Sequence, residues 1–142
     1  MAALCFMVTM VLYFVATMSF LTYLLRRSEA LSNVSLAITA VGFISHTVAL
    51  VIRMVEVSST VPPSFSDALS FFSWMIILVF VLVEFRHRIH VLGSFMVPLA
   101  LVSLVSSAAL PETVPTLQPV FKTLWFHVTL SMLGTVGFTV AF

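Results

Sequence analysis

The chain has 142 residues, of which 61% are hydrophobic and 8% are charged, and its six basic and five acidic side chains give a net charge of +1. A soluble domain carries about 25% charged residues, so the composition excludes that class and indicates a helical membrane protein. The small net charge excludes a nucleic acid-binding surface, and the single cysteine, Cys5, excludes a disulfide framework.

The apolar runs between the charged clusters predict five membrane-spanning helices, at about residues 2–25, 34–54, 65–83, 91–110 and 119–142. Each run is close to the roughly 20 residues that cross the hydrocarbon core. The first run is too long for a signal peptide and has no basic residue before it, so we expect it to be retained. The sequence therefore predicts an all-α, polytopic transmembrane bundle that forms a single domain over residues 1–142.

Three residues predict details of these helices. Ser64 and Asp67 have the spacing of a capping box, which places the start of the third helix. Pro119 suits the first position of the fifth helix, whereas Pro98 lies inside the fourth and is expected to kink it.

Basic residues predict the orientation. Four of them lie in the connections 26–33 and 84–90, namely Arg26, Arg27, Arg86 and Arg88, against Arg53 and Lys122 on the other side. The excess predicts that these two connections are cytoplasmic and that the N-terminus is outside. Because no polar residue follows the last apolar run, we expect the chain to be the N-terminal part of a longer protein.

A polar stripe follows one face of the second predicted helix. Ser35, Thr39, Gly42, His46 and Arg53 are separated by steps of 4, 3, 4 and 7 residues, which keep one helical face. This face should point toward protein or water rather than lipid. At the depth of His46, an ionisable side chain is either a functional group or a neutral histidine bonded to a neighbouring helix.

Arg53 lies at the outer interface. It either reaches the headgroups or pairs with Glu56, or it contacts an anionic ligand such as a carboxylate or propionate.

The fifth predicted helix carries a second polar face, formed by Thr123, His127, Ser131 and Gly134. His127 lies near the outer interface, where it is either a structural histidine or an axial ligand for a metal or heme. Trp125 fits an interfacial aromatic belt.

The inner connection combines His87 and His90 with Glu84, Arg86 and Arg88. This composition predicts a solvated, positively charged loop, and a metal site is the weaker interpretation. Because the sequence shows no nucleophile–base pair or phosphate-binding loop, cofactor or solute handling at the outer face remains.

Several segments together are similar to one family. They are the run from His46 to Arg53, the segment 65–74 after a proline loop, the stretch 93–99, and the stretch 117–128 that contains His127. In order and spacing, over about residues 40–142, the chain resembles the cytochrome c assembly family of heme-handling membrane proteins, of the CcsA, CcsB and ResC type.

The resemblance implies a function in cytochrome c biogenesis at the bacterial inner (plasma) membrane. Members of this family bind heme and present it at the outer face, where it is attached to apocytochrome c by a synthase complex with a partner membrane subunit. By position, His127 corresponds to an axial ligand of the heme iron. His46 and Arg53 are further candidates, along the heme path or as propionate contacts.

The chain departs from the family at Asp67, where Glu is usual, and at Thr123, where Ser is common. The tryptophan-rich segment and the second outer histidine of the family are absent from these 142 residues. Two alternatives therefore stay open, namely a subunit of a membrane transporter or channel and a non-catalytic structural partner of another membrane protein.

Overall fold

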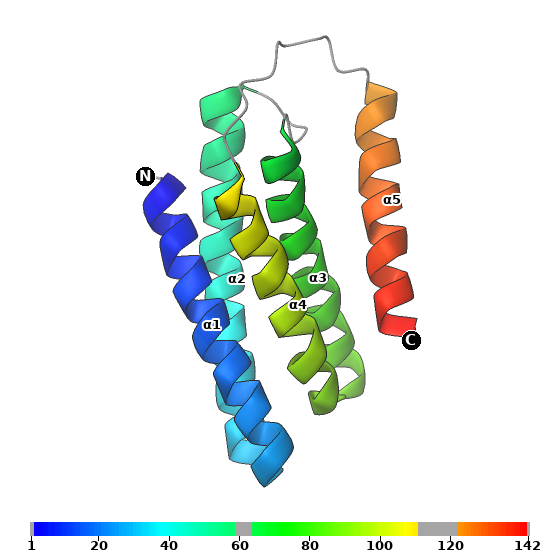
Figure 1. Ribbon diagram of the computed structural model, residues 1–142. Helices are drawn as coiled ribbons and strands as arrows, with labels where there is room; N and C mark the ends of the chain where they lie inside the picture. Colours follow the sequence, from blue (N-terminus) through cyan, green and yellow to red (C-terminus); the bar gives the residue numbers. More distant parts are fainter. Residues whose placement is uncertain (1, 59–63, 111–121, 142) are drawn as a thin grey trace.

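Helices make up the whole of the fold. The structure is a computed structural model that describes residues 2–58, 64–110 and 122–141, and those ranges contain five α-helices and no strand. In chain order the helices are α1 (Ala2–Arg26), α2 (Glu29–Val57), α3 (Phe65–His87), α4 (His90–Ala109) and α5 (Lys122–Ala141). Helices α1 to α4 pack as a bundle, and α5 stands beside α3 (Figure 1). The expected all-α bundle is confirmed.

Four of these helices are suited to cross a membrane. Helices α1 to α4 contain 25, 29, 23 and 20 residues, and each is long and apolar enough to span a bilayer. Within the described part of α5, the apolar stretch is Thr129–Phe138, so its crossing stays a prediction. Pro119, expected at the start of the fifth helix, lies outside the described residues.

Two helices run well beyond the expected spans. Helix α2 begins at Glu29 rather than near residue 34, and α3 continues to His87 rather than 83. Hydropathy marks the part of a helix that suits lipid, whereas the backbone stays helical until a cap ends it. Arg27, Ser58 and Arg88 follow α1, α2 and α3 with positive φ values of 47°, 52° and 52°.

The start of α3 confirms the expected capping box. The Ser64 hydroxyl accepts a hydrogen bond from the Asp67 backbone N–H at 3.0 Å. It also donates to the Asp67 carboxylate at 2.6 Å. The first turn of α3 is thereby fixed, and with it the position of the Asp67 side chain.

The bundle places small and hydroxyl-bearing residues inside and large apolar residues outside. Buried serines and threonines are Thr9, Thr17, Ser32, Ser35, Thr39, Ser70, Ser73, Ser94, Ser103 and Ser107. Exposed large residues include Leu4, Phe14, Val41, Ile44, Phe95 and Val102. Helices pack this way in lipid, because small side chains permit close approach and hydroxyls bond between helices. The chain is therefore a helical membrane protein.

The polar stripe on α2 forms its packing face. Ser35, Thr39, Gly42 and His46 are all buried, so the expectation that this face avoids lipid is confirmed. Gly42 lies so close to Tyr13 of α1 that a Cβ there would meet the ring at 2.8 Å. Close contact of α1 and α2 thus requires a glycine at this position.

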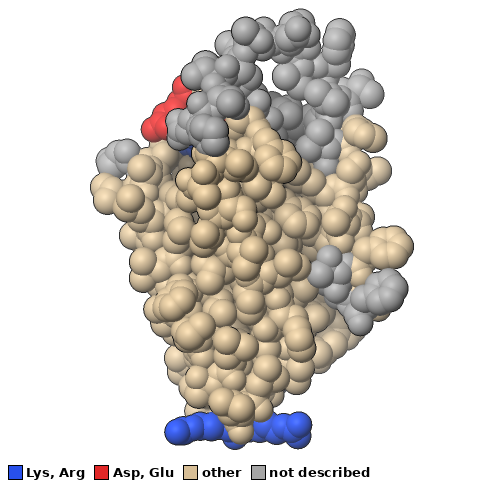
Figure 2. Space-filling view, viewed as in Figure 1, with Lys and Arg blue, Asp and Glu red and all other residues tan. Residues whose placement is uncertain are grey.

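The two ends of the bundle differ in charge. Short turns join α1 to α2 and α3 to α4 at one end, which we call the arginine end because it carries Arg26, Arg27, Arg86 and Arg88. It is the blue, lower end of Figure 2. At the opposite end α2 finishes and α3 and α5 begin (Figure 1), and we call it the cavity end.

Candidate functional site

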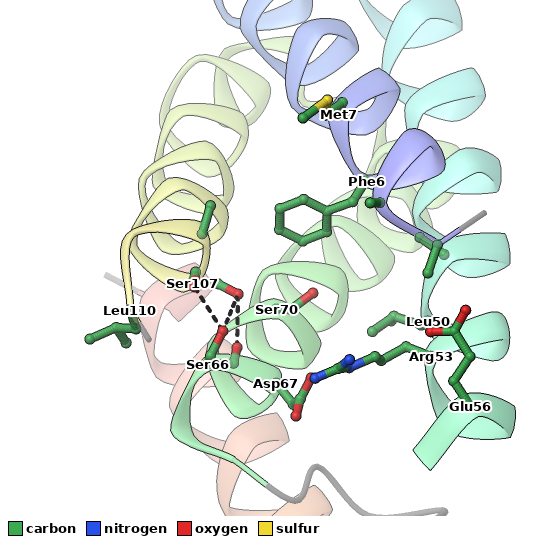
Figure 3. A pocket seen from close by; sticks show the side chains of 14 residues that line it. Phe6, Met7, Leu50, Arg53, Glu56, Ser66, Asp67, Ser70, Ser107 and Leu110 are labelled. Atoms are coloured by element: carbon green, nitrogen blue, oxygen red, sulfur yellow. Dashed lines mark hydrogen bonds and ion pairs between the residues drawn. The ribbon is translucent and has the colours of Figure 1, made fainter. Parts of the chain in front are cut away.

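A cavity of about 440 Å³ opens at the cavity end, between α1, α2, α3 and the last turn of α4. Its apolar wall comes from α1 and α2, and its polar wall comes mainly from α3 with Arg53 and Glu56 of α2 (Figure 3). The lining includes four alanines, which leave space that larger side chains would fill, namely Ala2, Ala3, Ala49 and Ala108. The volume lies within the 300–1,000 Å³ that is usual for ligand sites.

An ion pair between α2 and α3 forms the polar rim. Arg53 Nε lies 3.1 Å from Asp67 Oδ1, and the two side chains are 34% and 15% exposed. Because Ser64 binds the other carboxylate oxygen of Asp67, the pair is held in place by the helix cap. Arg53 therefore contacts Asp67 across helices, in addition to the alternatives expected from the sequence, and it lines the cavity (Figure 3).

A reciprocal pair of serines closes the cavity between α3 and α4. The Ser66 hydroxyl donates to the Ser107 carbonyl at 2.7 Å, and the Ser107 hydroxyl donates to the Ser66 carbonyl at 2.8 Å. Both hydroxyl hydrogens are thus used between the helices. We infer that these two serines shape the cavity by holding its wall together.

His46 lies beneath the cavity with both ring nitrogens bonded. Its Nε2 is 3.2 Å from the hydroxyl of Ser70, a cavity-lining residue, and its Nδ1 is 3.3 Å from the hydroxyl of Tyr13. The histidine is fully buried. A neutral imidazole has one donor and one acceptor nitrogen, and a hydroxyl can match either. In this arrangement neither nitrogen is open to a metal, so His46 connects the cavity wall to α1.

His127 has the opposite character. It lies near the start of α5 with an exposed side chain, and within the described ranges its imidazole makes no hydrogen bond or ion pair. Gly134 lies two turns further along the same face, and a Cβ there would meet no atom within 4 Å. The cavity lining contains no residue of α5, so the structure brings His46 and Arg53 to one region and leaves His127 outside it.

The expectation of a solvated loop at the arginine end is wrong for two of its residues. Glu84 is only 3% exposed, and its carboxylate is paired with Nδ1 of His90. Arg88 has a left-handed backbone that turns the chain back, so that His90 reaches the carboxylate of Glu84. His87, Arg86 and Arg88 are exposed, as expected.

No group of three or more metal-binding side chains is present in the described part of the chain. Comparisons with protein-family models, with curated proteins and with solved structures give no match. The chain is therefore interpreted from its own residues and geometry.

Proposed function

We propose that this protein handles heme in cytochrome c biogenesis. It binds heme and presents it at the outer face of the bacterial plasma membrane for attachment to apocytochrome c, together with a partner membrane subunit. The observation that carries the proposal is the exposed His127 imidazole on α5, with an open glycine two turns away on the same face.

The chemistry of heme agrees with this surface. Heme has a flat apolar ring, two carboxylates and an iron atom that takes imidazole as an axial ligand. Around His127, α5 exposes Phe126, Leu130 and Leu133, which are 66%, 71% and 44% accessible and would cover an apolar ring. The missing side chain at Gly134 leaves room beside the imidazole. The fit favours His127 over His46, because both nitrogens of His46 are already bonded.

Arg53 supports the same assignment. It lies at the cavity end, where α5 also begins, and its guanidinium supplies positive charge at the rim for a propionate. Asp67 neutralises part of this charge, so we assign Arg53 a supporting role and His127 the principal one.

Heme retention tests the proposal. His127→Ala should lower the Soret absorbance of the purified protein, whereas His87→Ala, an exposed histidine at the arginine end, should not. Equal heme content in the two variants would refute the assignment of His127. Because an imidazole must be neutral to bind iron, heme should also be released as the pH is lowered.

The orientation can be tested with single cysteines in a Cys5→Ser background. Ser28 lies exposed at the arginine end and Ser58 lies exposed at the cavity end. A membrane-impermeant thiol reagent added to intact cells should label Ser58→Cys and spare Ser28→Cys. The reverse pattern would place the cavity end in the cytoplasm and overturn the proposal.

The cavity favours a second candidate, a subunit of a transporter that binds a small solute. Its volume is suitable, but the polar stripe of α2 is packed, and the hydroxyl of Thr39 donates to a backbone carbonyl inside the bundle. Solute flux in proteoliposomes that contain no heme would support this candidate over heme handling.

A further inference from the structure

A second histidine is held in a geometry that suits a metal ligand, at the end opposite to His127. The last turn of α3, the first residue of α4 and the end of α1 meet at the arginine end. They bring together Glu84, His90 and Tyr23, which the sequence distributes over three helices.

Glu84 fixes the orientation of the His90 ring. Its Oε1 is hydrogen-bonded to Nδ1 of His90, and its side chain is 3% exposed. A carboxylate that accepts Nδ1–H leaves Nε2 as the nitrogen with a lone pair, which is the arrangement of many metal-bound histidines. Tyr23 packs edge-on against the ring, at a centroid distance of 6.1 Å. The His90 side chain remains 28% exposed, so the ring is held on two sides and still accessible.

The second oxygen of Glu84 adds a further argument. Oε2 is buried and has no hydrogen-bond partner among the described residues. An unpaired buried carboxylate oxygen is costly, and its negative charge favours a cation on the imidazole that it supports. The pair therefore lacks a positive centre on the accessible side of His90.

The surroundings indicate which kind of metal group fits. Leu25, Ile89 and Val91 expose apolar side chains at this end of the bundle, at 86%, 49% and 48%. The same end carries the exposed arginines Arg26, Arg27, Arg86 and Arg88 (Figure 2). A bare divalent ion would need more ligands than the described residues supply here. An iron porphyrin needs one imidazole, apolar contacts for its ring and positive charge for its carboxylates.

We propose that His90, oriented by Glu84, is a separate axial ligand for heme iron at the arginine end, with the arginines receiving the heme propionates. This inference rests on the proposed function and assigns a site that is distinct from His127. Glu84 acts as a positioning residue, because it contacts the imidazole and not the iron.

The test isolates this site by titrating ferric heme into purified full-length His127→Ala protein in detergent. We expect a Soret shift typical of imidazole ligation, which a further His90→Ala substitution abolishes and His87→Ala leaves unchanged. His87 is the matched control, because it is an exposed histidine at the same end of the bundle.

Two further variants separate ligation from folding. In Glu84→Gln the amide oxygen can still accept Nδ1–H but the charge is lost, so the heme dissociation constant should rise about tenfold or more. His90→Met should shift the Soret maximum, since a thioether replaces the imidazole, while circular dichroism reports the helical content. An unshifted spectrum in a folded His90→Met protein would refute the ligand role.

The outcomes distinguish this inference from the proposed function. If wild-type protein binds heme and His127→Ala alone removes all of it, the outer site stands and the His90 site is refuted. If His90→Ala removes the heme and His127→Ala does not, the His90 site stands and the role of His127 fails. A wild-type protein that binds no heme refutes both.

Discussion

Replacement of Gly42 by alanine tests how tightly α2 packs against α1 at the candidate site. A Cβ at this position would lie 2.8 Å and 2.9 Å from two ring carbons of Tyr13 and 3.3 Å from Cβ of Leu12. Ordinary carbon–carbon contacts are about 3.5–4.0 Å. Tyr13 is fully buried and its hydroxyl is bonded to His46, so the ring has no free direction in which to move.

The expected change in stability combines two opposing effects. Overpacking of a filled core costs about 1–3 kcal/mol, and two short contacts to an enclosed ring favour the upper half of that range. Alanine gains about 1 kcal/mol over glycine inside a helix. Gly42→Ala should therefore lower the free energy of unfolding by about 1–2 kcal/mol.

Gly137→Ala supplies the matched control, because a Cβ at Gly137 meets no atom within 4 Å. Only the helix propensity changes there, so stability should rise by up to about 1 kcal/mol. The measurement is unfolding of the purified protein by a denaturing detergent, followed by circular dichroism. Gly42→Ala protein as stable as the Gly137→Ala protein would contradict the close packing of α2 on Tyr13.

Three further changes test local features by the same unfolding measurement. Tyr13→Phe removes one partner of the buried His46 ring and should cost about 1–3 kcal/mol, and an unchanged stability would mean that this hydrogen bond is not formed. Ser64→Ala removes the cap of α3 and should cost about 1 kcal/mol, whereas a neutral effect would argue against the capping box. Ser58→Gly relieves a left-handed residue with φ 52° and should stabilise by about 1 kcal/mol, so a loss of stability would contradict that backbone conformation.

The helices and the packing face of α2 could be predicted from the sequence because both depend on local pattern. Uninterrupted apolar runs bounded by charge fix the approximate spans, and steps of three and four residues put Ser35, Thr39, Gly42 and His46 on one face. The buried state of that face follows from the cost of polar groups in lipid.

The partners of His46 could not be predicted, because they depend on how separate helices are placed. Tyr13 and Ser70 lie 33 and 24 residues away in the chain. A single buried tyrosine on an apolar helix is the only signal that points to Tyr13. Ser70 is separated from Ser66 by four residues and from Ser73 by three, a spacing that marks the inner face of α3.

The pairing of Glu84 with His90 shows why helical spacing alone misled the sequence analysis. Glu84 and Arg88 are four residues apart, as in a helical ion pair, but α3 ends at His87. Arg88 then takes a left-handed conformation, and its backbone N–H donates to the Glu84 carbonyl at 2.9 Å. The turn directs the chain back over α3, so His90 rather than Arg88 contacts the carboxylate.

The two short turns at the arginine end also have a consequence for how the chain assembles. Each joins a pair of helices through two residues, Arg27 and Ser28 in one case and Arg88 and Ile89 in the other. Contacts between helices that follow each other directly close only short loops, so each hairpin can form early, the first while the rest of the chain is still being synthesised.

Contacts between α1 and α4 join the two hairpins and must form later. Gly93 of α4 is central to this step, because a Cβ there would lie 2.5 Å from the ring of Phe20 on α1. Substitutions at this interface should therefore leave two inserted hairpins that fail to associate. Such a failure would expose buried serines to lipid and give quality control in the cell a recognisable substrate.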